Sequence, residues 1–296
     1  MTLALPAPRN LVSAIVVSSR PLSWVNTAYP FAAAYLLSGR SLDWRFVVGT
    51  LFFLVPYNAA MYGTNDVFDY ESDLRNPRKG GVEGGVLDPS LHRATLWAAW
   101  GLCAPFVALL ALGGSPGSWA VLAVSLFAVA AYSVPVLRFK ERPVLDSLTS
   151  STHFVSPAVY GLVLAGARPS PGVLAALGAF FAWGVASHAF GAVQDIVPDR
   201  EASIASIATL FGARATVRFA VVCYLAASGL LLLGAEGPGK WAGLLALPYA
   251  ANVAPFVTVS DAASGRARAG WRRFLWLNYV TGFLVTLILI GVWLGL

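Results

Sequence analysis

Charged side chains are scarce in this sequence, where Asp, Glu, Lys and Arg together make up only 11% of the 296 residues. Apolar residues make up 57%, and the mean hydropathy is +0.69. A soluble domain is rarely more than about half apolar, so this composition excludes an ordinary water-soluble protein. Roughly 20 apolar residues of helix span the hydrocarbon core of a bilayer, and the sequence contains many such runs. We therefore predict an all-α, polytopic membrane protein.

Cysteine and histidine are also rare. The two cysteines, Cys103 and Cys223, both lie in apolar runs, where cysteine usually acts as a small core residue, so neither a disulfide nor a metal pair is expected. His153 and His188 are separate in the sequence, and we interpret each as a hydrogen-bonded histidine of a membrane helix rather than a catalytic base. The net charge of +6 would suggest a nucleic-acid partner only in a soluble protein. In a membrane protein it reflects topology, so no nucleic-acid partner is expected.

Apolar runs separated by charged breaks predict nine transmembrane helices. They cover approximately residues 22–38, 46–65, 92–112, 118–136, 146–166, 172–193, 212–233, 241–259 and 274–294. With the N-terminus and every second loop on one side, that side holds sixteen of the 20 Lys and Arg residues. Because positively charged loops stay in the cytoplasm, we expect a cytoplasmic N-terminus and an external C-terminus in the plasma membrane. No small-residue cleavage site accompanies the first apolar run, so no removable signal peptide is expected.

Acidic side chains are concentrated in the segment 65–73, at the end of the second predicted span. Asp66, Asp69 and Asp73 occur there at positions i, i+3 and i+7, which places the three carboxylates on one face if the segment is helical. Like charges on one face repel each other, and a bound cation would relieve this repulsion. Ligation by oxygen alone favours Mg²⁺ or Ca²⁺ over zinc or copper. The alternative is a solvated acidic helix end with no ligand.

A second acidic pair, Asp195 and Asp199, follows the sixth predicted span. Its i, i+4 spacing also gives one helical face, although Pro198 is expected to break or kink a helix there. By itself the pair is no more than the polar residues expected in a loop. Two acidic groups that each close an even-numbered span are compatible with an internal repeat, and they allow two metal sites facing each other across a pocket.

Basic and hydroxyl side chains follow the acidic group and the fourth predicted span. Arg78 and Lys79 come just after the first acidic group, and Tyr132, Arg138 and Lys140 come at the end of the fourth span. A metal ion held by carboxylates, beside Arg, Lys and Tyr side chains that donate hydrogen bonds, is suited to binding a diphosphate. The metal and the donors neutralise the negative charge of the diphosphate leaving group. Positive-inside topology explains part of this basic charge without any function.

Asp146 opens the fifth predicted span beside the basic loop. A carboxylate at a helix N-terminus is commonly there only for its favourable interaction with the helix dipole. The alternative is a role toward a metal or water, and we include Asp146 among the predicted substrate-binding residues. The polar groups described above all fall on the predicted cytoplasmic side. A transporter more often keeps ionisable groups at mid-membrane depth, so this distribution indicates an enzyme whose soluble substrate arrives from the cytoplasm.

Together these motifs resemble those of the UbiA superfamily of intramembrane prenyltransferases, over nearly the whole chain. That family has nine transmembrane helices and an N-D-x-x-D-x-x-x-D motif after helix 2, which is similar to residues 65–73. Its D-x-x-x-D motif after helix 6 is similar to residues 195–199. The family has a Tyr and a Lys after helix 4, which Tyr132 and Lys140 resemble. It has basic residues just past the first motif, which Arg78 and Lys79 resemble, and polar groups on helix 1, which Arg20 and Asn26 resemble.

The resemblance implies a single transmembrane prenyltransferase domain over residues 1–296, with residues 1–20 as a short cytoplasmic N-terminal segment and the active site on the cytoplasmic side. It implies a prenyl diphosphate donor and Mg²⁺, with Mn²⁺ as an alternative that shares its ligand preferences. The implied metal ligands are Asp66, Asp69, Asp73, Asp195 and Asp199, and they act in catalysis with Lys140 and Tyr132. The implied substrate-binding residues are Arg20, Asn26, Asn65, Arg78 and Lys79, and we add Arg138 and Asp146 from their positions in and beside the basic loop.

Three stretches, residues 19–31, 76–85 and 149–154, resemble more narrowly the actinobacterial lycopene elongases. That branch adds C5 units from dimethylallyl diphosphate to the ends of lycopene, on the way to C50 carotenoids. The resemblance implies lycopene as a lipophilic acceptor within the lipid bilayer, and other carotenoid-pathway enzymes as partners. Two alternatives stay open: an aromatic prenyltransferase that makes a quinone, haem or chlorophyll precursor, and a cation-dependent transporter that uses the acidic groups as ion sites.

Overall fold

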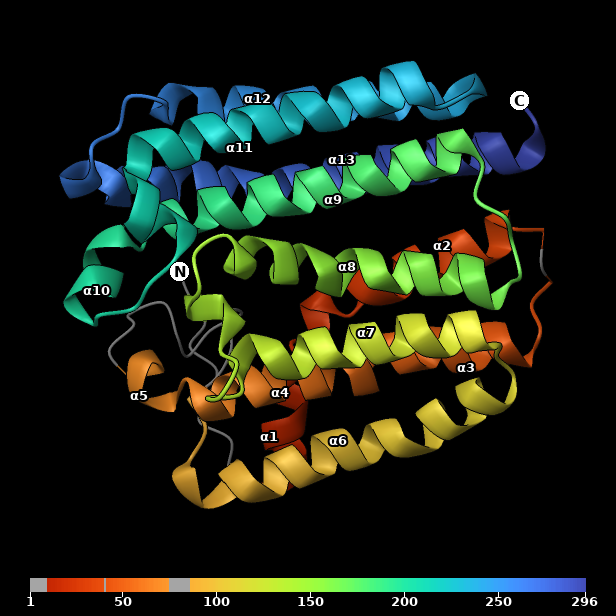
Figure 1. Cartoon of the computed structure of the whole chain (residues 1–296), viewed down its shortest axis with the longest axis horizontal. Coiled ribbons are helices and arrows are strands. Elements are labelled where there is room, and N and C mark those ends of the chain that lie inside the picture. The colour runs from red at the N-terminus through yellow and green to blue at the C-terminus, as the bar shows by residue number, and fades with distance from the viewer. Residues whose placement is uncertain (1–9, 40, 75–85) are drawn as a thin grey trace. The chain divides into compact units, whose positions relative to one another are not determined.

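The computed structural model describes residues 10–39, 41–74 and 86–296, and within these ranges every regular element is a helix (Figure 1). The chain divides into two compact units. The first runs from the start of the described chain to Arg138 and also includes Ser156–Arg168. The second comprises Phe139–Val155 and Pro169–Leu296.

The first unit contains the N-terminal helices. They are α1 (Leu11–Ser18), η1 (Pro21–Ser23), α2 (Val25–Leu37), α3 (Trp44–Leu54), α4 (Pro56–Phe68), α5 (Tyr70–Asp73), α6 (Pro89–Leu112) and α7 (Pro116–Ser133). The later part of α8 (Leu145–Leu164) also belongs to this unit. Polar residues that accept hydrogen bonds from the first-turn amides begin several of these helices: Asn10 before α1, Asp43 before α3, Asp88 before α6 and Ser115 before α7. Such caps satisfy N–H groups that have no partner within the helix.

The second unit contains the start of α8 and the remaining helices. They are η2 (Phe139–Glu141), α9 (Pro171–Val193), α10 (Ile196–Glu201), α11 (Ile207–Gly234), η3 (Gly237–Ala246), α12 (Leu247–Val253), η4 (Ala254–Phe256), η5 (Asp261–Ala267) and α13 (Arg268–Leu294). Ser170 and Ser206 cap the N-termini of α9 and α11. Within this unit α9 packs along the length of α11 (Figure 1).

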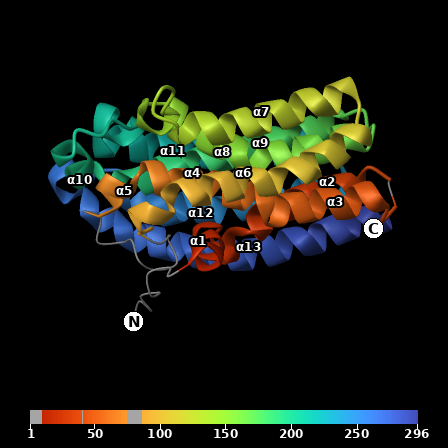
Figure 2. The same ribbon diagram turned by 90° about the horizontal axis from the view of Figure 1, so that it is seen from below.

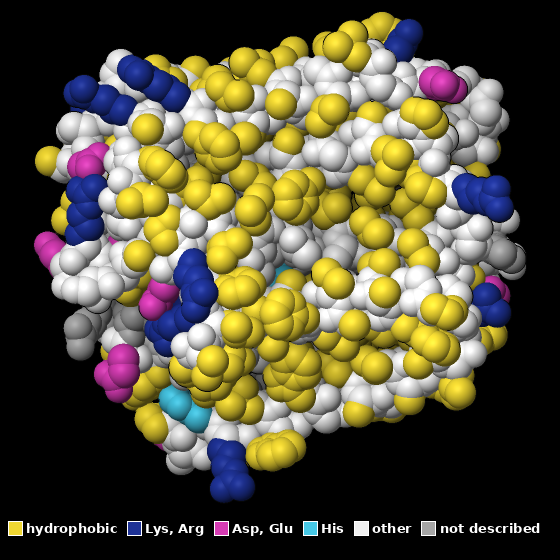
Figure 3. Space-filling view, in the orientation of Figure 1, with side chains coloured by type: hydrophobic (Ala, Val, Ile, Leu, Met, Phe, Trp, Pro, Cys, Tyr) yellow, Lys and Arg dark blue, Asp and Glu magenta, His cyan; other side chains and the backbone are white. Residues whose placement is uncertain are grey.

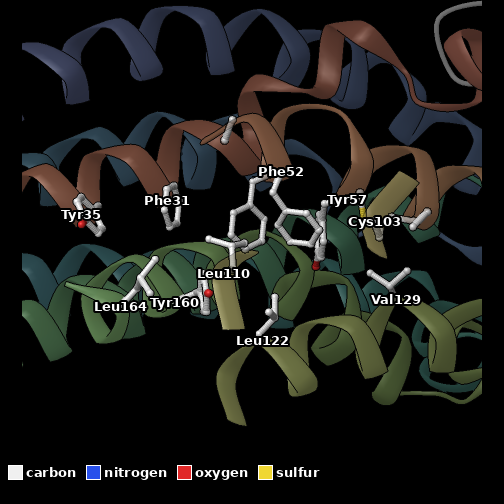
Figure 4. Close-up of a cluster of buried hydrophobic side chains, with 14 of the residues drawn as sticks. Phe31, Tyr35, Phe52, Tyr57, Cys103, Leu110, Leu122, Val129, Tyr160 and Leu164 are labelled. Carbon is white, nitrogen blue, oxygen red and sulfur yellow. The ribbon is translucent and has the colours of Figure 1, made fainter. Parts of the chain in front are cut away.

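Aromatic side chains form the core of the first unit (Figure 4). The Phe31 ring lies 5.3 Å from the Phe53 ring and 6.0 Å from the Tyr160 ring, centroid to centroid, and all three side chains are fully buried. Gly161 lets the backbones approach closely, because a Cβ there would lie only 2.6 Å from the carbonyl oxygen of Phe31. In Figure 2, α2 and α3 of this unit lie side by side, in agreement with their contacts.

At the interruption between α3 and α4, buried side chains supply hydrogen bonds to the backbone. Pro56 has no N–H to continue the helix, and the helix is interrupted at Val55. The carbonyl of Phe53 instead accepts hydrogen bonds from Thr27 Oγ1 at 2.6 Å and from Asn58 Nδ2 at 2.8 Å. Asn58 Nδ2 also donates to Thr27 Oγ1 at 2.7 Å. Membrane helices tolerate proline where neighbouring groups satisfy the freed carbonyls in this way.

The core of the second unit combines aromatic rings with paired hydroxyl groups. The Tyr224 and Tyr249 rings are stacked with centroids 5.5 Å apart. The Tyr224 hydroxyl lies 3.0 Å from Ser187 Oγ, and the Tyr249 hydroxyl donates to Asn278 Oδ1 at 2.8 Å. Buried hydroxyls without partners would be costly, so these pairs allow tyrosine to serve as a core residue.

Six helices in the described part of the chain are long and apolar enough to cross a membrane: Trp44–Phe68, Pro89–Leu112, Pro116–Ser133, Pro171–Val193, Ile207–Gly234 and Asp261–Leu294. Each coincides with one of the nine predicted spans. The other three predicted spans, 22–38, 146–166 and 241–259, are also largely helical, but their helices are shorter, more polar or broken. The count of nine and the single domain over 1–296 therefore stay predictions. Hydrophobic side chains cover much of the face seen in Figure 3, as expected for contact with lipid.

We predict that Gly161→Ala destabilises the protein whereas Gly101→Ala does not. Overpacking a close contact typically costs about 1–3 kcal/mol, and the new methyl group at position 161 would meet the Phe31 carbonyl. Gly101 lies on α6 with nothing within 4 Å of its Cβ position, so alanine there should gain up to about 1 kcal/mol of helix propensity. Thermal unfolding of both variants in the same detergent gives the comparison. Equal melting temperatures would contradict the close helix approach.

Candidate active site

The first acidic motif lies where α4 ends. Asn65 and Asp66 belong to the last turn of α4, Asp69 is its C-terminal cap, and Asp73 is the last residue of α5. The segment is not the single continuous helix that the i, i+3, i+7 spacing assumes. Asp69 has φ −99° and ψ 0° and separates α4 from α5. The three aspartates therefore come from two short helices and the residue between them.

Asp66 is a buried carboxylate paired with an arginine. It is 1% exposed, and its Oδ1 accepts a hydrogen bond from Arg20 Nη2 at 3.0 Å. The Arg20 guanidinium also lies over the Tyr62 ring, 4.2 Å from its centroid, which adds a favourable cation–π contact. A buried charge is stable only when it is paired and hydrogen-bonded, so Arg20 and Asp66 depend on each other.

A second arginine lies beside Asp69. Arg138 Nη2 is 4.0 Å from Asp69 Oδ1, and the Asp69 residue is 8% exposed. Ser133, at the end of α7, donates to Asn65 Oδ1 at 3.3 Å. Arg20 and Arg138 both have positive φ, of 51° and 44°. Non-glycine residues rarely adopt this conformation, and such residues cluster at functional sites.

Within the first unit, five predicted site residues are thus brought together: Arg20, Asn65, Asp66, Asp69 and Arg138. Tyr132 lies half-buried in the last turn of α7, next to Ser133. Asn26 is exposed on α2, and within the described ranges no hydrogen bond joins it to these five. Arg78, Lys79 and the side chain of Asp73 lie outside the described residues.

The second acidic motif forms the short helix α10 in the second unit. Asp195 is its N-cap and Asp199 lies in its first turn, where the Asp199 N–H donates to the Asp195 carbonyl at 2.8 Å. Pro198 does not break α10, but the chain is interrupted one turn earlier, since α9 ends at Val193 and α10 begins at Ile196, and that is where a proline at position 198 is expected to break a helix. The helix begins at Ile196, so Pro198 occupies the first turn, where a backbone N–H has no partner within the helix in any case. Lys140, also in this unit, lies half-buried in η2.

Asp146 is fully buried, and both its carboxylate oxygens accept backbone hydrogen bonds. Oδ1 accepts from Ser147 N and Oδ2 from Ile207 N, each at 2.7 Å. The second bond joins the start of α8 to the first residue of α11. Beside it, the Ser147 hydroxyl lies 3.0 Å from His188 Nδ1, in agreement with the expectation that this histidine is hydrogen-bonded within a helix. This geometry favours an anchoring role for Asp146 over contact with a substrate.

The acidic motifs suit a hard cation such as Mg²⁺. Within the described residues no three acidic, histidine or cysteine side chains lie close enough together to hold an ion by themselves. Mg²⁺ does not need such a group, because it usually binds one or two carboxylates together with substrate phosphates and water. Asp66 and Asp69, buried beside two arginines, match this donor set. Two residues at this site, Tyr62 and Ser133, were not predicted from the sequence. The available signals are that Tyr62 lies one helical turn before Asp66 and that Ser133 directly follows Tyr132.

The described residues form helices, six of them long and apolar enough to cross a membrane, with buried acidic groups at one helix end, and this places the chain in the class of multi-pass membrane proteins. Comparison with known proteins identifies the family. The model of the UbiA prenyltransferase family matches residues 27–280, and this chain belongs to that family. It is a prenyltransferase, and the resemblance inferred from the motifs is confirmed.

Two characterised relatives are similar over most of this chain. A lycopene elongase/hydratase of Corynebacterium glutamicum is 52% identical over 278 residues, which cover 94% of this chain and 96% of the relative. The C(50) beta-cyclic carotenoids biosynthesis protein LbtBC of Dietzia sp. (strain CQ4) is 56% identical over 285 residues. That match covers 96% of this chain and 66% of the Dietzia protein, so this chain spans slightly less than two thirds of that relative.

Solved structures show the same fold. A UbiA homolog from Archaeoglobus fulgidus bound to DMAPP and Mg²⁺ matches with a TM-score of 0.65 at 20% identity, covering 90% of this chain and 98% of the other. An apo UbiA homolog from Aeropyrum pernix K1 matches with a TM-score of 0.62 at 18% identity, covering 86% and 98%. At these identities the likeness establishes the fold.

We predict that removing Arg20 alone costs more stability than removing Arg20 and Asp66 together. Arg20→Met removes the ion pair between Arg20 and the buried Asp66 carboxylate and should lower the free energy of unfolding by about 3 kcal/mol. The double variant Arg20→Met/Asp66→Asn should recover more than half of that loss. Arg93→Met, which removes an exposed charge from α6, is the control and should have little effect. Additive losses in the double variant, measured by detergent-based unfolding, would argue against a coupled pair.

We also predict that Asp146→Asn is strongly destabilising. An asparagine oxygen can replace one acceptor, but its NH₂ group would face the other backbone N–H, leaving buried donors without acceptors. The expected cost is about 1–3 kcal/mol. Asp88→Asn is the matched control, because Asp88 is an exposed N-cap that bonds Ser90 N, and asparagine caps equally well. A wild-type melting temperature for Asp146→Asn would mean that its two backbone bonds contribute little.

Proposed function

We propose that this chain transfers a prenyl group from dimethylallyl diphosphate to lycopene, with Mg²⁺ or Mn²⁺, in the synthesis of C50 carotenoids. The observation that carries the proposal is the 52% identity, over nearly the full length of both chains, to a lycopene elongase/hydratase. The buried carboxylates and arginines at the end of α4 supply the donor set that a metal-bound diphosphate requires.

The proposed reaction begins with cleavage of the allylic C–O bond, in which the diphosphate leaves with the electron pair and an allylic cation remains. The metal, when bound, neutralises charge on the departing diphosphate. Asp66, Asp69, Asp73, Asp195 and Asp199 are the proposed metal ligands. Arg20, Arg138, Lys140 and Tyr132 are proposed to contact phosphate, with Arg78, Lys79, Asn26 and Asn65 as further substrate contacts.

In the next step the terminal double bond of the acceptor attacks the allylic cation, forming a C–C bond and a tertiary cation. That cation loses a proton to give an alkene, or it captures water and then releases a proton to give an alcohol. An olefin has no acidic proton that must be removed before attack, so no strong general base is required at that step. This is compatible with a site built from carboxylates and basic donors rather than around a histidine.

The proposed topology places this chemistry on the cytoplasmic face of the plasma membrane, with the N-terminus in the cytoplasm and the C-terminus outside. The support is the distribution of basic residues, since sixteen of the 20 Lys and Arg fall on one side of the nine-span arrangement. Both acidic motifs follow even-numbered spans and so belong to that side. Dimethylallyl diphosphate is water-soluble and would reach the site from the cytoplasm, while lycopene would arrive from the bilayer.

The test is transfer in proteoliposomes that contain lycopene, dimethylallyl diphosphate and Mg²⁺, with products resolved by mass. We expect the lycopene mass to rise in C5 steps, and we expect this increase to disappear when the metal is chelated. Asp69→Asn should lower the rate by about 100-fold or more, in line with the loss of a group that stabilises developing charge. Glu71→Gln is the matched control, because it removes an exposed carboxylate two residues away, and its rate should stay near wild type.

The outcomes separate the possible functions. Diphosphate release without any change in lycopene would contradict the proposal that lycopene is the acceptor, and aromatic acceptors would then be assayed. Full activity in Asp69→Asn would contradict the role of the first acidic motif. Absence of turnover with any prenyl donor, in protein that is folded, would overturn the proposed reaction.

A further inference from the structure

Asp261, at the start of η5, connects three segments of the second unit. Its Oδ2 lies 2.8 Å from Arg200 Nη1, and its Oδ1 accepts a hydrogen bond from Ala213 N at 2.7 Å. Arg200 is in α10, immediately after Asp199, and Ala213 is in α11. One carboxylate of η5 therefore joins this segment to α10 and α11, although Asp261 is distant in sequence from Arg200 and Ala213.

The contact with Ala213 occurs at an interruption of α11. Gly212 has φ 77° and ψ 165°, so the helix stops there and resumes at Ala213. An N–H at the start of a helical segment has no partner within the helix, and Asp261 supplies that partner from outside. A Cβ at position 212 would lie 3.1 Å from Asp261 Oδ1, so the glycine provides both the backbone conformation and the space for the carboxylate.

Arg200 has a second fixed contact. Its Nη2 donates to the carbonyl oxygen of Thr209 at 2.9 Å, in the part of α11 that precedes the interruption. A guanidinium is planar and presents its N–H groups in a rigid arrangement, so two acceptors on one guanidinium restrict both its position and its orientation. Fixing the Arg200 side chain in this way also limits the movement of the Arg200 backbone, which directly follows Asp199.

The helix that carries the second acidic motif is too short to hold its own position. α10 has only six residues, and helices of that length are not stable without tertiary contacts. Ile196 is buried at its beginning, and Arg200 is bound near its end. Asp195 comes directly before the first anchor and Asp199 directly before the second, so the orientation of both carboxylates depends on these anchors.

We propose that Asp261, acting through Arg200, is a positioning residue for the second acidic motif: it holds α10 so that Asp195 and Asp199 present their carboxylates to the metal–diphosphate group. The proposal rests on the metal role proposed above for that motif. Asp261 does not itself bind the metal or the substrate. Arg200 and Asp261 are partly exposed, at 47% and 37% of their side-chain areas, and exposed ion pairs contribute little to global stability, so their function is local.

The test uses the full-length protein in detergent and two single variants, Asp261→Asn and Arg200→Gln. The matched control is Arg218→Gln, which removes an exposed arginine of α11. The first readout is hydrogen exchange of residues 196–204 without metal, which needs no activity. The second is the affinity for Mn²⁺ in the presence of inorganic pyrophosphate, followed by electron paramagnetic resonance of the free ion. The third is the Mg²⁺ concentration that gives half-maximal prenyl transfer.

We expect both variants to exchange faster at α10 and to bind Mn²⁺ about 10-fold or more weakly, because residues that orient metal ligands typically change affinity by that factor. The half-maximal Mg²⁺ concentration should rise by a similar factor, while the control resembles wild type and all melting temperatures stay within a few degrees. The double variant should be no weaker than the weaker single variant, since both substitutions release the same helix. Asp261→Glu should recover part of the affinity.

Unchanged exchange at α10 and unchanged Mn²⁺ affinity in folded Arg200→Gln would overturn the proposal. Faster exchange throughout α9–α13 with a large fall in melting temperature would also overturn it, because the role would then be purely structural. If Asp261→Asn fails to fold through loss of the Ala213 bond, Arg200→Gln, which leaves that bond intact, decides the question. A wild-type protein that transfers no prenyl group would refute the proposed function, whereas the exchange measurement would still test the anchoring of α10.

Discussion

The structure depends on the requirement that polar groups surrounded by hydrocarbon find partners within the protein. A charge in this setting is costly unless an opposite charge and hydrogen bonds accompany it. Asp66 meets this requirement through Arg20, which in turn lies on the Tyr62 ring. The same requirement explains the paired tyrosine hydroxyls in the second unit, where Ser187 and Asn278 provide the partners. Acidic residues can therefore be placed at a helix end only together with the groups that balance them.

This requirement also separates two uses of carboxylates in the chain. Asp66 and Asp69 lie next to arginine side chains, the setting in which we propose that a metal-bound diphosphate binds. Asp146 accepts hydrogen bonds from two backbone amides, and one of these bonds joins the start of α8 to α11. A carboxylate that contacts charged side chains is suited to binding a ligand, whereas a carboxylate that accepts hydrogen bonds from backbone amides is suited to holding helices together.

The sequence predicted the helical membrane class, the family, and the residues gathered at the end of α4. These features depend on composition and on short spacings, which a single sequence displays directly. The break at Asp69 was not predicted, because the spacing rule assumes an uninterrupted helix. The position of Pro198 in a first turn was also not predicted, because it depends on where α10 begins. Ile207, which donates to Asp146, and Ala213, which donates to Asp261, lie 61 and 48 residues away from these carboxylates in the chain, and no local pattern reveals contacts at that distance.

The interruption between α3 and α4 has a consequence for how the sequence can change over evolutionary time. Thr27 and Asn58 come from different helices, yet they share one set of hydrogen bonds around the Phe53 carbonyl, beside the break that Pro56 follows. Loss of Asn58 or Thr27 removes a side-chain donor from the Phe53 carbonyl at this interruption of the helix. The three positions should therefore be inherited as a group, with substitutions at one accompanied by substitutions at the others in homologous chains.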